Sequence, residues 1–132
     1  MCILALSRAR QVPTAVIMAG PVHNWMHWLI EYLPMFYLAE MSEEVWSRAP
    51  FLIRDGVTRR PNHMDSLRRV YTGPVPLELP DHTVVAVQNP VILRSPNRPG
   101  PPTFGVFPSD QTKSFDFALM AKFREKLISS IS

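Results

Sequence analysis

The chain has 132 residues, of which 46% are hydrophobic and 19% are charged. This composition supplies enough apolar material for the core of one domain and excludes wholesale disorder. The formal net charge of +3 comes from small, separated groups of arginines, which is too sparse a pattern for a nucleic-acid-binding face.

The first half of the chain contains a predicted strand followed by a predicted helix. Residues 14–19 are a continuous apolar run that ends at Gly20 and Pro21, which is typical of a buried parallel strand before a turn. Residues 24–41 are too long an apolar segment for a strand, so they predict a buried helix. Asn24 is the expected N-cap, and Pro34 is expected to bend this helix because it removes a backbone donor.

The second half predicts two further strands and two further helices. Residues 49–54 and 83–93 are the strand candidates, and residues 61–70 and 114–128 are the helix candidates. Alternating strands and helices predict an α/β domain with a mainly parallel sheet. We therefore expect a single three-layer, Rossmann-like domain over residues 1–132, with residues 14–19 and 84–87 as central strands covered on both faces.

No sequence feature indicates secretion or insertion into a membrane. One cysteine, Cys2, excludes an internal disulfide and fits a reducing compartment. The apolar stretch of residues 28–39 contains Glu31 and Pro34 and is too short to span a bilayer. We expect a cytoplasmic protein whose only membrane contact would be peripheral, through arginines that attract an anionic surface or ligand.

Three residues near the start of the long helix have side chains that could carry chemistry. His23, His27 and Glu31 are spaced by four, which places them on one helical face. They could bind a metal, or a carboxylate could orient His27 for hydrogen bonding or proton transfer. A third interpretation is a buried histidine that bonds to a backbone carbonyl.

The metal interpretation is the weakest of the three. The zinc-protease helix requires Glu directly after its first His, whereas Asn24 follows His23. We therefore expect no metal. We also expect no cofactor, because none of the five glycines forms a phosphate-binding G-x-G-x-x-G run.

Two tryptophans flank His27 at the edge of the sheet where ligands bind in α/β folds. Trp25 and Trp28 could form a wall against a sugar ring, and the alternative is that they pack in the core.

The segment that contains these residues resembles a known family. Residues 24–34 read Asn-Trp-Met-His-Trp-Leu-Ile-Glu-Tyr-Leu-Pro. This resembles the signature of glycosyltransferase family 61, which is Asn, an aromatic, any residue, His-Trp-Leu, then an acidic residue and Leu-Pro. The order of strands and helices that follows is also similar, although the specific match is confined to this segment.

The resemblance implies an inverting transferase that moves a sugar from a nucleotide sugar to a glycan or polysaccharide acceptor. Members include capsule and exopolysaccharide enzymes, xylosyl- and arabinosyltransferases and N-acetylglucosaminyltransferases. They have a GT-B-type pair of Rossmann-like domains that face a cleft, and this chain resembles the N-terminal, acceptor-side half. The donor-binding half carries an Arg-containing strand and an Asn-Glu motif, which nothing in this chain matches. The chain is thus expected to be a fragment that is inactive alone and meets its donor through a missing second domain.

Carried over by motif, His27 and Glu31 are the candidate catalytic residues, and either could be the base. The candidate substrate-binding residues are His23, Asn24, Trp25 and Trp28. Two alternatives stay open: a non-catalytic, truncated α/β module and a small metal-binding protein. The donor sugar, the acceptor and the oligomeric state are left open by the sequence.

Overall fold

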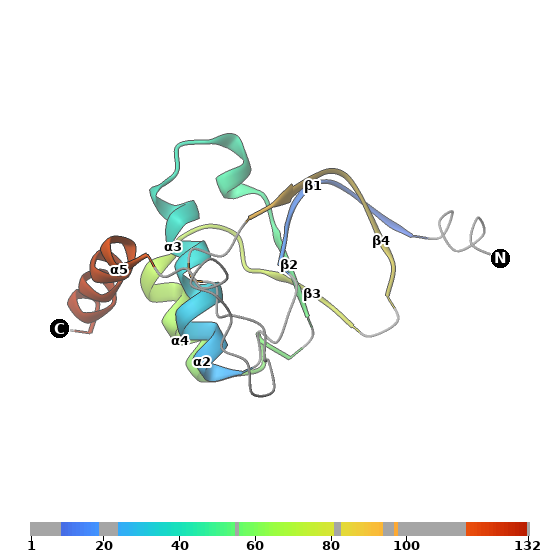
Figure 1. Ribbon diagram of the computed structural model, residues 1–132. Coiled ribbons are helices and arrows are strands. Elements are labelled where there is room, and N and C mark those ends of the chain that lie inside the picture. Colours follow the sequence, from blue (N-terminus) through green and yellow to red (C-terminus); the bar gives the residue numbers. More distant parts are fainter. Residues whose placement is uncertain are drawn as a thin grey trace, which may run out of the picture.

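The computed structural model describes residues 9–18, 24–54, 56–80, 83–93, 97 and 116–131. Its strands are β1 (Arg10–Ile17), β2 (Phe51–Arg54), β3 (Leu77–Leu79) and β4 (Val85–Ile92). One continuous helical segment consists of α2 (Trp25–His27), the π-helix η1 (Trp28–Tyr32) and α3 (Leu33–Met41). The 3-10 helix η2 (Val45–Arg48) and the helices α4 (Pro61–Val70) and α5 (Phe117–Ser129) complete the described elements (Figure 1).

The four strands form one parallel sheet in the order β3-β2-β1-β4. The predicted α/β fold with a parallel sheet is therefore confirmed. β1 lies inside the sheet, with Val16 opposite Phe51 of β2 and Val91 of β4. Strand β3 was not predicted, because its three residues lie between prolines that suggest a loop.

The expectation that residues 84–87 form a central strand is wrong. β4 is an edge strand that pairs with β1 alone, and its side chains are half-buried or exposed. Pro90 is compatible with this position, since a proline that lacks an N–H donor is tolerated at a sheet edge. The apolar, β-branched composition of this strand therefore reflected strand propensity and not burial on both faces.

The helices of the described chain pack against one face of the sheet. Val16, Phe51 and Ile53 belong to the main core, which they form together with residues of α3, α4 and α5. A second, smaller cluster contains Val12, Ala15 and Leu52, and the apolar neighbours of these three all come from strands. Figure 1 shows the helices gathered on one side of the strands. The described residues thus form two layers, and the second helical layer of the predicted three-layer domain is not found among them.

The long helix begins and changes geometry where the sequence suggested. Asn24 caps it, as predicted, because its Oδ1 accepts hydrogen bonds from the backbone N–H groups of Met26 and His27 at 3.0 and 3.4 Å. One turn before Pro34 the helix widens into a π turn, and the N–H of Leu33 bonds to the carbonyl of Trp28. Pro34 has no N–H to offer the carbonyl of Ile30, which would be its α-helical partner. The side-chain amide of Asn97 donates to that carbonyl instead, at 2.6 Å.

Candidate active site

The strand order places a ligand-binding position next to β1. The connections from β1 to β2 and from β2 to β3 extend the sheet in one direction, and β4 then pairs on the other side of β1. In open α/β sheets, ligands bind outside the carboxyl ends of the strands at such a reversal. The helical segment that follows β1 begins at this edge, so His27 and Glu31 lie at the position where the topology favours a site (Figure 1).

His27 and Glu31 form a close pair on this helical segment. Nδ1 of His27 lies 2.5 Å from Oε1 of Glu31. The geometry fits the Nδ1–H tautomer of His27, in which Nδ1 donates a hydrogen bond to Glu31, because an ionised carboxylate can only accept. The neutral ring then keeps its lone pair on Nε2, which is the tautomer that a general base requires. The pair is partly open to solvent, with 39% of the His27 side chain and 14% of the Glu31 side chain exposed.

The carboxylate of Glu31 also acts on Tyr32, its neighbour in the π turn. Burial of the phenol raises the pKa of Tyr32, and the negative charge of Glu31 raises it further. Tyr32 is thus held as a neutral hydroxyl and is not a candidate base.

Trp28 is part of the core. Its side chain is fully buried, and its ring packs against Phe36 with 5.8 Å between centroids. The indole N–H donates to Oγ of Ser66 at 2.9 Å, and the Ser66 hydroxyl donates to the carbonyl of His63 at 2.8 Å. Because Trp28 has no exposed surface, it cannot form a wall for a sugar ring, and of the two tryptophans only Trp25 keeps that role as a prediction.

Trp25 is 42% exposed and borders a pocket of about 580 Å³. The pocket is lined by Trp25, Arg59, Arg60, Pro61, Asn62 and His63. Of these residues, only Trp25 was selected from the sequence as a site residue. The sequence predicted that arginines could attract an anionic surface or ligand but did not single out this pair. Nothing in a single sequence indicates that the loop before α4 lies against the start of α2.

Asn24 and His23 are the other two residues that the sequence predicted to bind substrate. Asn24 caps the helix through its side-chain oxygen, so the structure gives it a structural role, and its contact with a substrate stays a prediction. His23 lies outside the described residues. The face that His23, His27 and Glu31 would share is therefore described only for His27 and Glu31.

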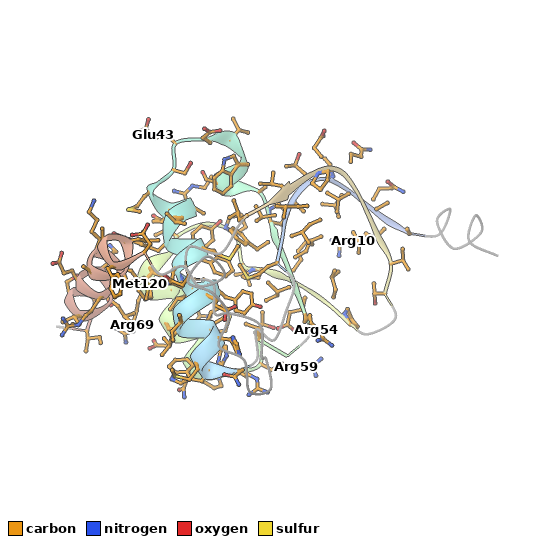
Figure 2. All side chains as sticks on the ribbon, viewed as in Figure 1. Arg10, Glu43, Arg54, Arg59, Arg69 and Met120 are labelled. Carbon is orange, nitrogen blue, oxygen red and sulfur yellow. The ribbon has the colours of Figure 1, made fainter. Side chains whose placement is uncertain are left out.

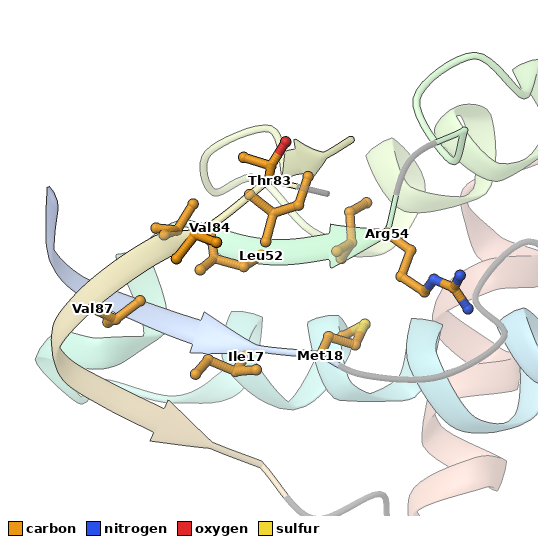
Figure 3. Close-up of a pocket in the computed structure, with 10 residues that line it drawn as sticks. Ile17, Met18, Leu52, Arg54, Thr83, Val84 and Val87 are labelled. Atoms are coloured by element: carbon orange, nitrogen blue, oxygen red, sulfur yellow. The ribbon is translucent and has the colours of Figure 1, made fainter. Parts of the chain in front are cut away.

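A second pocket lies on the face of the sheet that none of the described helices covers. It measures about 440 Å³ and is lined mainly by aliphatic side chains, among them Ile17, Leu52, Val84 and Val87. In Figure 3 Thr83 and Val84 lie beside Leu52, and the side chain of Arg54 points away from these aliphatic side chains. Among the described residues that line it, Thr83 and Arg54 have polar side chains.

Within the described ranges, no group of three or more His, Cys, Asp and Glu residues is arranged to hold a metal ion. None of the helices in those ranges is long and apolar enough to cross a bilayer. Comparisons of the chain with protein-family models, with curated proteins and with solved structures find no match.

Proposed function

We propose that this chain is the acceptor-side, Rossmann-like part of a GT-B-type glycosyltransferase that inverts the configuration of the transferred sugar. The proposal rests on the His27–Glu31 pair, in which a carboxylate 2.5 Å away orients the imidazole. Two further observations support it. The pair lies on the helix after β1, at the edge where parallel α/β sheets bind ligands, and the surrounding residues resemble the signature of family 61.

In this mechanism His27 is the base and Glu31 positions it. Nε2 of His27 takes the proton from an acceptor hydroxyl as that oxygen attacks the anomeric carbon of the donor. The bond between the anomeric carbon and the diphosphate oxygen breaks, and the nucleoside diphosphate leaves with the electron pair. The carboxylate of Glu31 stabilises the imidazolium that forms, because it accepts a hydrogen bond from Nδ1 throughout. The groups that hold the diphosphate would come from a donor-binding domain outside this chain.

Glu31 is the positioning residue in this assignment because its carboxylate lies at hydrogen-bond distance from Nδ1 of His27, which leaves Nε2 for the substrate. Its side chain is also the more enclosed of the two, which leaves the imidazole as the group nearer to solvent and substrate. The assignment predicts the tautomer of His27. Nitrogen NMR above pH 8, where an ordinary imidazole is neutral, should find the proton on Nδ1, and Glu31→Gln should weaken that preference.

The decisive test is transfer from a panel of nucleotide sugars to oligosaccharide acceptors, measured on the full-length product of the reading frame. His27→Gln should lower kcat by a factor of about 10² to 10⁴, the usual contribution of a general base. The melting temperature should stay within a few degrees, because His27 is partly exposed. Glu31→Gln should lower kcat while leaving KM for the acceptor near its original value.

Two results would contradict the proposal. One is the absence of transfer from every nucleotide sugar in the panel by the folded protein. The other is a loss of activity in His27→Gln that only follows a loss of folded protein, which would favour the alternative of a non-catalytic module whose signature helix packs the core.

A further inference from the structure

The pocket beside Trp25 combines an exposed aromatic ring with two arginines. Arg59 and Arg60 come from the loop before α4, and Trp25 comes from the start of the helical segment after β1. In Figure 2, Arg54 and Arg59 lie at the end of the molecule where α2 begins. None of the described residues that line the pocket is acidic. Two guanidinium groups beside an aromatic ring favour an anionic ligand.

The loop that carries the two arginines is anchored through the residues that precede them. Gly56 adopts φ = 98°, a backbone conformation that L side chains rarely adopt, and so permits the turn after β2. The carboxylate of Glu78 in β3 accepts hydrogen bonds from the N–H groups of Gly56 and Thr58. Val57 is fully buried between these two anchors. The N–H of Arg60 then bonds to the carbonyl of Val57 at 3.0 Å. Binding of a ligand to these arginines therefore loses little entropy to ordering of the loop backbone.

The aromatic wall is held in place as well. The ring of Trp25 meets the buried His63 edge-on, with 5.2 Å between centroids, and the ring of Trp28 lies 4.9 Å from His63. The hydrogen bonds from Trp28 to Ser66 and from Ser66 to the carbonyl of His63 fix this group against α4. The Trp25 indole is thus packed against His63 of α4, next to the arginine loop.

The start of α4 adds to the positive potential of the pocket. Pro61 occupies its first turn, and none of the described side chains caps this end. The N-terminus of a ten-residue helix carries a partial positive charge. The nearest acidic residue within α4, Asp65, lies one turn further along and forms an ion pair with Arg69 at 2.9 Å. Its charge is therefore partly neutralised on the side away from the pocket.

We propose that this pocket binds an acidic sugar, with the carboxylate or phosphate on Arg59 and Arg60 and the sugar ring against the face of Trp25. Guanidinium groups bind both anions in bidentate geometry, and the C–H face of a sugar packs on an indole ring. The volume of about 580 Å³ lies within the usual range for small-ligand sites. Its identification as a subsite for an acidic acceptor rests on the proposed function, whereas the binding itself depends only on the pocket.

The test is a titration of the chain with glucose 6-phosphate, glucuronate, glucose and inorganic phosphate. Binding is followed by the backbone N–H resonances of Asn62 and His63, which line the pocket and are present in every variant. We expect a Kd in the millimolar range for one of the two acidic sugars, and the pair of probes decides between phosphate and carboxylate. Glucose should bind at least tenfold more weakly than that sugar. Arg59→Ala with Arg60→Ala should weaken binding at least tenfold. Trp25→Ala should weaken binding of the acidic sugar but not of inorganic phosphate.

Arg68→Ala is the matched control, because it removes an equally exposed arginine from a later turn of α4. It should leave all four affinities unchanged, and far-ultraviolet circular dichroism should show that each variant is folded. Equal affinity for glucose and both acidic sugars, or unchanged binding in the double arginine variant, would overturn the inference. Transfer to neutral acceptors without binding of acidic sugars would leave the proposed function standing and reject this subsite. Binding of an acidic sugar without transfer to any acceptor would support this subsite and reject the proposed function.

Discussion

The side-chain amide of Asn97 donates a hydrogen bond to the carbonyl of Ile30, which lies 67 positions earlier in the chain, at a distance of 2.6 Å. The same side chain accepts a hydrogen bond from the backbone N–H of Asp116 at 3.0 Å, just before α5. Asn97 is 1% exposed, so its amide is shielded from water. One buried amide thereby satisfies the carbonyl that Pro34 leaves without an α-helical donor and joins the candidate active-site helix to the start of α5.

Removal of this amide should destabilise the protein. Asn97→Ala leaves the carbonyl of the half-buried Ile30 without its described donor, whereas the N–H of the exposed Asp116 can bond to water instead. Urea denaturation should show a loss in the free energy of unfolding of about 1–3 kcal/mol, the cost of one unsatisfied group. Asn62→Ala, which alters an exposed residue of α4, is the control and should change stability by less than about 0.5 kcal/mol. Equal midpoints for the two variants would contradict the role of Asn97.

Truncation of the two tryptophans of the signature segment should lower the free energy of unfolding by different amounts. Trp28→Ala removes a fully buried ring and its hydrogen bond to Ser66, so it should cost about 3–5 kcal/mol. Trp25→Ala should cost less than about 1 kcal/mol, because much of its ring is already in water. Chemical denaturation of the two variants measures this difference directly. A large loss in Trp25→Ala would mean that its ring is a packing element and not the wall of a pocket.

Glu40 should make stability depend on pH. Burial of its carboxyl acts to raise the pKa, but hydrogen bonds from the N–H and hydroxyl of Thr72 and the charge of Arg48 outweigh it, so the pKa of Glu40 is lowered. A lowered pKa in the folded state means that the stabilisation is present above the unfolded value of about 4.3 and is lost as pH falls through the folded value. Glu40→Gln should thus be less stable than the parent at pH 7, by up to about 1 kcal/mol for this partly exposed group.

At pH 2.5 the difference between Glu40→Gln and the parent should have shrunk markedly, since the parent carboxyl is then largely protonated as well. Urea midpoints at the two pH values provide the comparison. Glu43→Gln, on the exposed segment after α3, is the control for the removal of one negative charge. A deficit in Glu40→Gln that is equally large at both pH values would instead indicate a loss of packing.

The isolated chain should not bind a nucleotide sugar tightly. The sequence has no glycine-rich phosphate loop, and nothing in it matches the donor-side motif of the family that it resembles. Calorimetry with several nucleotide sugars should therefore show no Kd below about 1 mM, which corresponds to about 4 kcal/mol. Micromolar binding of a nucleotide sugar, or turnover by the isolated chain, would mean that the donor site lies within these residues.

Local patterns in the sequence determined much of what the structure contains. The apolar run before Gly20 predicted β1, and the choice of Asn24 as an N-cap required only that its short oxygen reach the next N–H groups. The spacing of His27 and Glu31 predicted their contact, because residues four apart on a helix are neighbours. Each of these features depends on residues within a few positions of one another, which a single sequence displays directly.

Only the tertiary structure decided which strand lies at the edge of the sheet, which tryptophan is buried and what surrounds Trp25. Val85–Ile92 and Arg10–Ile17 both have the composition of strands, and only pairing shows that β4 has one neighbour and β1 has two. Trp28 is buried because Ser66 lies beside it, 38 positions later, and the pocket exists because Glu78 anchors the loop of Arg59 and Arg60. Contacts between distant positions form only after the chain has folded, so no local periodicity or spacing encodes them.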